Sequence, residues 1–246
     1  MSSESPLAPM LRKLTQSSPL GAADREAILA LPHKLRQFAP GSYIVREGDA
    51  ATHACVLLSG YAYRHKVVGD GGRQVLALHM KGDVVDLQNS FLKAADHNVQ
   101  TITKAEVALI PREAVREIAF ARPAIGMAMW HDTLVDGSVH REWTANVGRR
   151  DARTRMAHLL CEFGVRLDQA GLGTLCDYDL PMTQEQIADA TGLTSVHVNR
   201  TLMALDREGW TRRNMRSVHI RDWDQLAGVG DFDPAYLHLT PKPLAA

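Results

Sequence analysis

The sequence predicts an α+β protein with an N-terminal antiparallel β-roll, one long helix and a C-terminal winged helix-turn-helix. Three observations lead to this fold class. Short apolar runs between glycine turns fill residues 38–111, apolar residues four apart follow Pro123, and two short helical patterns meet at Gly192 ahead of a hairpin. We expect four segments, namely a first helix with the roll (1–122), the long helix with a hinge (123–148), the winged helix-turn-helix (149–226) and a tail (227–246).

The composition is that of a globular protein able to bury two modest cores. Of its 246 residues, 45% are hydrophobic and 23% are charged, and the formal net charge is +0. A polyanionic partner would therefore have to meet a local basic patch. One candidate lies between Val196 and Arg221, where six arginines accompany two acidic residues.

Three scattered cysteines with no CxxC pair argue against a disulfide framework or a structural zinc site, so we expect no metal. The opening MSSESPLAPMLRKLTQ lacks the apolar core of a signal peptide, and no window approaches the ~18 apolar residues of a membrane span. These features predict a cytoplasmic protein without a membrane partner.

The β-roll prediction rests on the runs YIV, ACVLLSG, YAYRHKVV, QVLALHM, VVDL and VALI. Runs this short, rich in Val, Ile, Leu and Tyr and separated by turn residues, are typical of antiparallel strands in a barrel or roll. The stretch VVGDGGRQV is the clearest hairpin among them.

The stretch after Pro123 has helical spacing and more apolar surface than packing on the roll requires. We expect about six turns, ended by Gly148 in the left-handed conformation. A surplus apolar flank on a long helix is best buried against a twin, which predicts a parallel homodimer seam. The predicted seam residues are Trp130, Leu134, Val135, Val139 and Trp143.

A further helix is expected after Asp151, which can cap its first turn. Its apolar stripe runs from Met156 to Leu167, and the pattern stops at AGLG. The join between the two helices is a natural hinge.

The stretch Leu180–Leu205 predicts two short helices at a glycine turn. Thr183 and Gln186 form a capping box for the first helix, Gly192 ends it and Thr194 caps the second. Apolar residues at i, i+4 and i+7 of the second helix form its buried side and turn its polar residues outward. An exposed Arg can bond guanine O6 and N7, and Asn can bond adenine, so this face suits the major groove.

The segment behind it predicts a hairpin, with strands at Trp210–Arg212 and Ser217–Ile220 and arginines at or near its tip. A basic hairpin beside a reading helix can hold phosphates. An exposed turn made soluble by arginine is the other interpretation.

Four motifs in this order carry a family resemblance: PGSYIVREGD (40–49), the later Gly60, KGDVV (81–85) and LPMTQEQIADATGLTSVHVNRTLMAL (180–205). They resemble the Crp/Fnr superfamily of bacterial transcription regulators over nearly the whole chain. The resemblance implies a cyclic-nucleotide-binding-like roll and a dimeric DNA-binding regulator on a palindromic operator. RNA polymerase is then a further candidate partner.

The resemblance also implies roles for individual residues. It places base reading at Ser195, Val196, Asn199 and Arg200, and contacts to phosphates or flanking DNA at Thr183, Thr194, His197, Arg212, Arg213 and Arg216. Many relatives carry an acidic residue where this chain has Val196, so its operator should differ. The sequence HVNR (197–200) resembles the form that the recognition helix takes in a large branch of the family.

The roll departs from the cyclic-nucleotide members of the family. Asp86 and Leu87 stand where a Gly-Glu pair would hold the ribose, and no Arg occurs from Gly82 to Pro111. A cyclic phosphate would meet carboxylates in place of a cation, so we expect no cyclic AMP binding and no cofactor. Polar residues that could instead bind a small organic effector, or solvate a loop, are Asp86, Gln88, Asn89, His97 and Gln100.

Other sensors of the family use iron or haem. The N-terminus lacks the cysteine cluster of the iron–sulfur members, and Gln88 stands where the carbon-monoxide sensors carry a histidine. Haem ligation by His79, His97 or Cys55 is an alternative left open.

Two other functions compete with DNA-binding regulation. No phosphate-binding loop and no GxSxG elbow occurs, so the chain is not expected to be an enzyme. The second rival is a ligand-sensing or partner-binding roll with weak or no specific DNA binding, against which Arg200 argues. The tail, with Phe232, Tyr236, Leu237 and Leu239, is expected to pack on the DNA-binding domain or the hinge.

Overall fold

The computed structural model describes residues 5–239 and divides the chain into two compact units. Unit 1 takes the described residues of Met1–Arg64, Leu78–Ser138 and Leu237–Ala246, and unit 2 takes His65–Ala77 and Val139–Tyr236. The chain therefore enters unit 2 twice.

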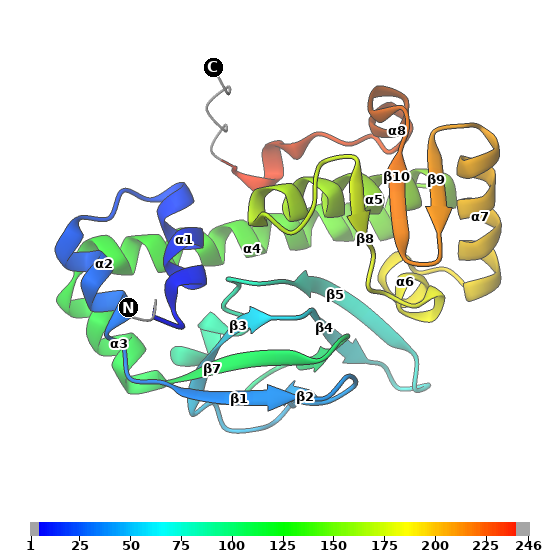
Figure 1. Ribbon diagram of the computed structural model, residues 1–246. Helices are drawn as coiled ribbons and strands as arrows, with labels where there is room; N and C mark the ends of the chain where they lie inside the picture. Colours follow the sequence, from blue (N-terminus) through cyan, green and yellow to red (C-terminus); the bar gives the residue numbers. More distant parts are fainter. Residues whose placement is uncertain (1–4, 240–246) are drawn as a thin grey trace, which may run out of the picture. The chain divides into compact units, whose positions relative to one another are not determined.

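Unit 1 is built on the predicted roll (Figure 1). Two helices, α1 (Ala8–Ser17) and α2 (Ala22–Leu29), precede it, and α3 (Arg112–Ala121) follows it. The strands of the roll are β1 (Lys34–Phe38), β2 (Tyr43–Val45), β3 (His53–Ser59), β4 (Ala62–Val67), β5 (Arg73–His79), β6 (Asn98–Thr101) and β7 (Ala105–Pro111).

The strands form two antiparallel sheets, in the orders β1-β7-β3 and β2-β6-β4-β5. Their alternating apolar residues make a core that includes Leu57, Val99 and Val107, all fully buried. The predicted hairpin connects β4 and β5, where the Val68 N–H donates to the Gly72 carbonyl at 2.9 Å. The prediction missed β1 and β6, because most of their side chains are polar.

One predicted strand is wrong. In the run VVDL, only Val84 pairs, through an isolated bridge to Val56, and the chain then turns into a 3-10 helix, η1 (Leu87–Ser90). The side chain of Asp86 explains the break, because its Oδ1 accepts from the Cys55 N–H at 2.9 Å, in place of a ladder bond from a neighbouring strand.

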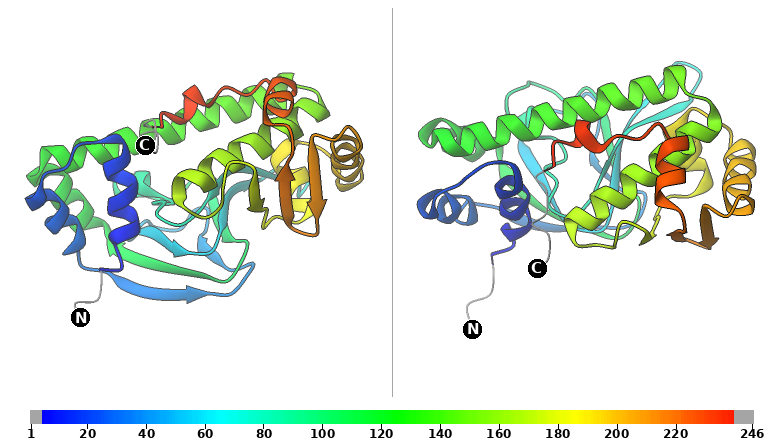
Figure 2. Two further views of the ribbon diagram at one scale, coloured as in Figure 1. Left: turned by 45° about the horizontal axis from the view of Figure 1, so that its top comes forward. Right: turned by 90° about the horizontal axis from the view of Figure 1, so that it is seen from above.

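The predicted long helix is α4 (Pro123–Arg149), which Figure 2 shows as one continuous element. Its 27 residues make about 7.5 turns at 3.6 residues per turn, more than the six expected. Gly148 does not end it: this residue lies inside the helix, and the chain leaves the helix only after Arg149. A glycine in a last turn thus has no need of the left-handed conformation when the helix continues past it.

Unit 2 holds the C-terminal elements. They are α5 (Ala152–Ala170), β8 (Asp177–Asp179), α6 (Gln184–Thr191), α7 (Ser195–Arg207), β9 (Thr211–Asn214), β10 (Ser217–Ile220), α8 (Trp223–Val229) and a 3-10 helix, η2 (Pro234–Leu237). Helix α5 begins and ends as predicted, with Asp151 accepting from the Thr154 N–H and Gly171 at φ 68°. Its stripe from Met156 to Leu167 is buried.

The predicted hairpin is β9–β10, and β8 completes a three-stranded sheet in the order β8-β10-β9. The outer part of the β4–β5 hairpin, His65–Ala77, belongs to unit 2, where Nε of Arg73 donates to Asp189 on α6 at 2.6 Å. None of the helices among residues 5–239 is long and apolar enough to cross a membrane.

Candidate nucleic-acid interface

The turn between α6 and α7 has the caps and the glycine conformation that the sequence predicts. Thr183 and Gln186 form both bonds of the capping box, and the Thr194 hydroxyl accepts from the His197 N–H at 3.2 Å. Gly192 adopts φ 64°, and a Cβ there would approach Cγ1 of Val147 to 3.1 Å. Glycine therefore serves two needs here, a left-handed turn and close packing against α4.

Burial separates the two sides of α7. Val198, Leu202 and Leu205 are buried, whereas Val196 is 70% exposed and Asn199 and Arg200 are exposed. The structure thus presents an aliphatic, an amide and a guanidinium group together on one open helical face. Ser195 in the first turn is half-buried.

The edge of this face toward α6 is held by a side-chain contact, in which Nε2 of Gln184 donates to Oδ1 of Asn199 at 3.4 Å. The amide of Asn199 is therefore oriented, although the bond is long.

The opposite flank of α7 borders a groove. It is lined by Asp151 and Arg153 at the start of α5 and by His197, Arg200 and Thr201 on α7. Arg153 pairs with Glu208 and lies 4.7 Å over the ring of Trp210. Sequence reasoning missed Arg153, because nothing in its local pattern places the first turn of α5 beside α7.

The arginines predicted at or near the hairpin tip differ in how far they are exposed to solvent. Met215 at the tip has φ 55° and is 91% exposed, and Arg212 and Arg216 are exposed as well. Arg213 is half-buried, and desolvation lowers the pKa of its guanidinium despite nearby Asp206. Thr183 and Thr194 are exposed at the starts of the two helices.

The predicted effector residues of the roll lie in two settings. Asp86, Asn89 and His97 are buried, whereas Gln88 and Gln100 are half-buried. Gln100 donates to the Gly41 carbonyl at 2.7 Å and accepts from the Tyr63 hydroxyl. These contacts give Gln100 a structural role in joining strands.

Asp86 is a buried carboxyl with a raised pKa. Burial raises its pKa to about 6, while the bond from the Cys55 N–H and the nearby charge of Arg64 act in the opposite direction. The Cys55 thiol is buried beside it, and desolvation raises its pKa as well.

Arg64 on β4 is a buried cation that the sequence analysis did not identify. Its Nη1 pairs with Asp136 of α4 at 2.7 Å, and its Nη2 donates to the Val85 carbonyl at 2.8 Å. The prediction that no cation meets a cyclic phosphate rests on Gly82–Pro111 alone, and Arg64 comes earlier in the chain.

Two buried histidines lie near this cation. Burial lowers the pKa of His79 to about 4, with Arg64 adding to the effect and Asp83 opposing it. Burial, with Arg64, also lowers the pKa of His97, whose Nδ1 lies 2.6 Å from Asp96. In the described part of the chain, no group of three or more His, Cys, Asp and Glu side chains could hold a metal ion.

The predicted dimer residues are not equivalent on α4. Trp130 and Leu134 are 61% and 53% exposed, Val135 is half-buried, and Val139 and Trp143 are buried within the chain itself. The prediction of Val139 and Trp143 as seam residues is corrected, because their side chains are covered without a second copy.

Two family models match the chain. A model described as a cyclic nucleotide-binding domain matches residues 35–122, and one described as a Crp-like helix-turn-helix domain matches residues 154–229. The first match covers the roll, and the second covers the candidate interface.

The relatives with similar sequences include proteins named as transcriptional activators. The chain is 26% identical over 196 residues to a probable transcriptional activator of Rhizobium leguminosarum bv. viciae, covering 79% of this chain and 80% of that protein. It is 28% identical over 197 residues to the transcriptional activator protein FnrL of Cereibacter sphaeroides, covering 78% of each.

Solved structures show the same fold. That of FixK2 from Bradyrhizobium japonicum aligns with a TM-score of 0.74 at 24% identity, covering 81% of this chain and 98% of that one.

Proposed function

This chain belongs to the Crp/Fnr superfamily of DNA-binding transcription regulators, and we propose that it acts as a homodimer on a palindromic operator without control by cyclic AMP. The open face of α7 is the observation that carries this proposal. The rival, a roll without specific DNA binding, is not favoured, because the helix-turn-helix is intact in its caps, turn and buried side.

We propose that Val196, Asn199 and Arg200 read base edges in the major groove, with Ser195 at the start of the helix. An Arg fork matches guanine, an amide matches adenine, and an aliphatic side chain meets the thymine methyl. Thr183, Thr194, His197, Arg212, Arg213 and Arg216 are proposed to contact phosphates or flanking DNA.

The dimer seam is proposed on the outer face of α4. Met127, Trp130 and Leu134 are exposed apolar residues at i, i+3 and i+7, which places them on one side of the helix. A row of this kind on a long helix is the part that a second copy would cover.

The roll does not fit a cyclic nucleotide well. The buried cation Arg64 is already engaged by Asp136 and the Val85 carbonyl, and Asp86, buried beside it, would face an incoming phosphate with a second acid. Leu87 has no hydroxyl-binding group to offer a ribose. A small polar effector contacting Gln88 remains compatible with these contacts.

We further propose that the chain is not an enzyme, that it works in the cytoplasm where bacterial DNA is found, and that RNA polymerase is its partner at promoters. These statements follow from the regulator assignment.

The experiment that tests the function is selection of bound duplexes from a random pool with the full-length protein, followed by genomic footprinting. The expected result is an inverted repeat whose half-site centres lie ~34 Å apart. Specific recognition would be contradicted if no sequence is enriched and the affinity depends on the salt concentration but not on the duplex.

A further inference from the structure

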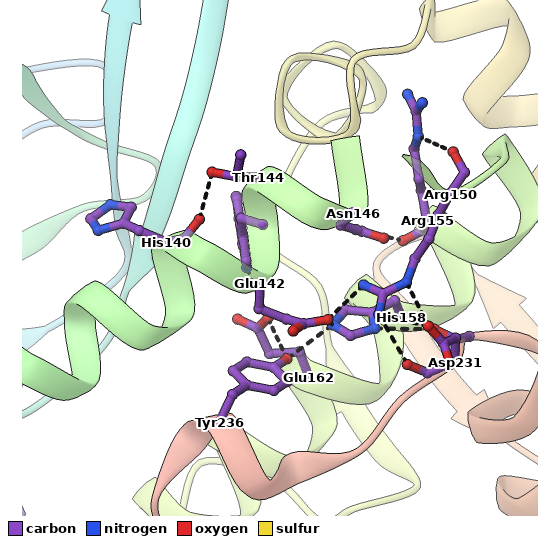
Figure 3. A network of polar contacts seen from close by, with 12 residues as sticks. His140, Glu142, Thr144, Asn146, Arg150, Arg155, His158, Glu162, Asp231 and Tyr236 are labelled. Atoms are coloured by element: carbon purple, nitrogen blue, oxygen red, sulfur yellow. Dashed lines mark hydrogen bonds and ion pairs between the residues drawn. The ribbon is translucent and has the colours of Figure 1, made fainter. Parts of the chain in front are cut away.

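The segment that follows α8, residues 230–236, crosses the junction between α4 and α5 and is held there at two points (Figure 3). We call this segment the strap, and we call Arg149–Asp151 the junction. The strap and every residue that holds it belong to unit 2.

The first anchor is Arg150, which lies in the junction itself. Its Nη2 pairs with Oδ2 of Asp231 in the strap at 2.8 Å, and its Nε donates to the same oxygen at 3.1 Å. Its Nη1 lies 2.6 Å from Oε1 of Glu142 on α4. One guanidinium therefore joins the last turns of α4 to the strap.

The second anchor is the Tyr236 hydroxyl. It donates to Oε2 of Glu162 on α5 at 2.8 Å and lies 3.0 Å from Nε2 of His158. The same Glu162 oxygen accepts from the indole of Trp143 on α4 at 2.8 Å. Burial raises the pKa of Tyr236, so its hydroxyl keeps the proton that it donates.

The backbone of the strap fits closely on α5. A Cβ at Gly230 would lie 2.8 Å from the backbone nitrogen of His158. The ring nitrogen Nδ1 of the buried His158 lies 3.0 Å from the Gly230 carbonyl. The next residue, Asp231, has φ 47°, a strained value for a residue with a side chain. The carboxylate of this residue is the one that Arg150 binds.

The junction is also tied to the helix-turn-helix. Nε of Arg155 donates to the Arg150 carbonyl at 2.7 Å, and its Nη1 donates to the Thr191 carbonyl at the end of α6 at 3.0 Å. Arg155 therefore bonds the junction to the end of α6, just before the turn that precedes α7.

We propose that the strap holds the α4–α5 junction in one conformation in the DNA-free protein, and that this order strengthens DNA binding. A junction that is already ordered loses less conformational entropy when a duplex binds. The inference rests on the proposed function only for its second half, because the order of the junction exists without DNA.

The test uses two conservative variants of the full-length protein. Tyr236→Phe removes one hydroxyl and keeps the ring that stacks on His158. Asp231→Asn removes the charge that Arg150 meets, and asparagine tolerates the left-handed backbone at this position. The matched controls are Tyr43→Phe on the roll and Asp224→Asn on the exposed side of α8.

Hydrogen–deuterium exchange without DNA measures the first half of the proposal. Both strap variants should exchange residues 142–158 about tenfold faster, the effect of losing one or two net hydrogen bonds, while the controls leave exchange there unchanged. Unchanged exchange in both strap variants, at full occupancy of the folded state, would overturn the strap regardless of DNA binding.

Affinity for duplexes selected by the wild-type protein measures the second half. Each strap variant should bind about three- to tenfold more weakly, and the double variant should lose less than the product of the two single losses, because both residues hold one element. Tighter binding by either variant would show an inhibitory strap and overturn the proposal. A wild-type protein that binds no duplex would instead refute the proposed function, with the exchange result still valid.

Discussion

The indole of Trp143 donates to the carboxylate of Glu162 at 2.8 Å, so the largest side chain predicted for the dimer seam is used inside the chain. The outer face of α4 is left with the exposed row Met127, Trp130 and Leu134. A dimer that depends on α4 must therefore depend on this row, in which Trp130 and Leu134 were also predicted from the sequence.

We expect the double variant Trp130→Ala, Leu134→Ala to be monomeric at micromolar concentration while remaining folded. The reason is that its changes remove exposed apolar surface only. Sedimentation velocity measures the association state and circular dichroism the fold. Leu172→Ala, at a partly exposed site in the loop after α5, is the control. A monomeric wild-type protein, with or without DNA, would rule out the seam.

Cyclic AMP should neither bind nor be required for DNA binding. Arg64 is engaged by Asp136, and Asp86 lies buried nearby. Titration calorimetry of the full-length protein should give no saturable heat at micromolar nucleotide. The prediction fails if a saturable heat appears and is abolished by Arg64→Met.

Arg200→Ala should lose about 1–3 kcal/mol of discrimination at one base pair in each half-site, because a bidentate contact to guanine is lost. Arg216→Ala should weaken all duplexes alike and lower the salt slope by roughly one unit, since a phosphate contact carries no sequence information. A competition assay over all single-base variants at fixed salt separates the two. Equal flat losses would mean that α7 does not read bases.

The half-buried Arg213 should behave differently from Arg216. Arg213→Ala is expected to weaken all duplexes alike as well, but also to lower the melting temperature of the protein, because its side chain is half-buried in the folded state. Thermal unfolding of the two variants side by side checks this, and an unchanged melting temperature for Arg213→Ala would count against it.

Val196→Glu should shift the preferred base toward cytosine on the strand that faces the carboxylate. Valine can only meet a thymine methyl, whereas glutamate accepts from cytosine N4. At 70% exposure the new charge stays in water in the free protein, so stability should hardly change. Selection from a random pool with this variant would show an unchanged site if residue 196 does not approach a base.

Asp86→Asn should stabilise the protein at neutral pH. The pKa of Asp86 is raised from 3.8 to about 6, so the folded state holds this proton more tightly than the unfolded chain does. Its favourable contribution is present below about pH 4 and is lost as the pH rises through 6. The gain from asparagine should thus grow between these values, to at most about 3 kcal/mol at pH 7.

Urea unfolding of the wild type and Asp86→Asn at several pH values between 5 and 8 measures that difference. Asparagine keeps an oxygen for the Cys55 N–H, so the bond survives. A gain that is constant with pH would show that the charge of Asp86 is not the cause.

Local chemistry explains how much of this molecule could be predicted. The capping box at Thr183, the left-handed Gly192 and the buried stripe of α7 each depend on residues a few positions apart, and their geometry follows from that spacing. The same holds for the hairpin between β4 and β5.

Features that depend on distant partners could not be predicted. Trp143 has the spacing of a seam residue, but a carboxylate nineteen positions later on α5 decides where it lies. Arg64 gains its importance from Asp136, and β8 is a strand only because β10 pairs with it. The sequence predicts that the tail packs on the DNA-binding domain or the hinge, yet nothing in it indicates that Arg150 anchors the strap.

The division of unit 2 into two stretches of chain bears on protein engineering. Residues 139–236 look like a cassette that could be transplanted to change operator choice, but Asp189 on α6 takes its partner Arg73 from the β4–β5 hairpin, which the cassette leaves behind. A chimera joined at one crossover would carry an acidic α6 without its arginine. Re-targeting this regulator is therefore better done by exchanging the exposed side chains of α7 in place.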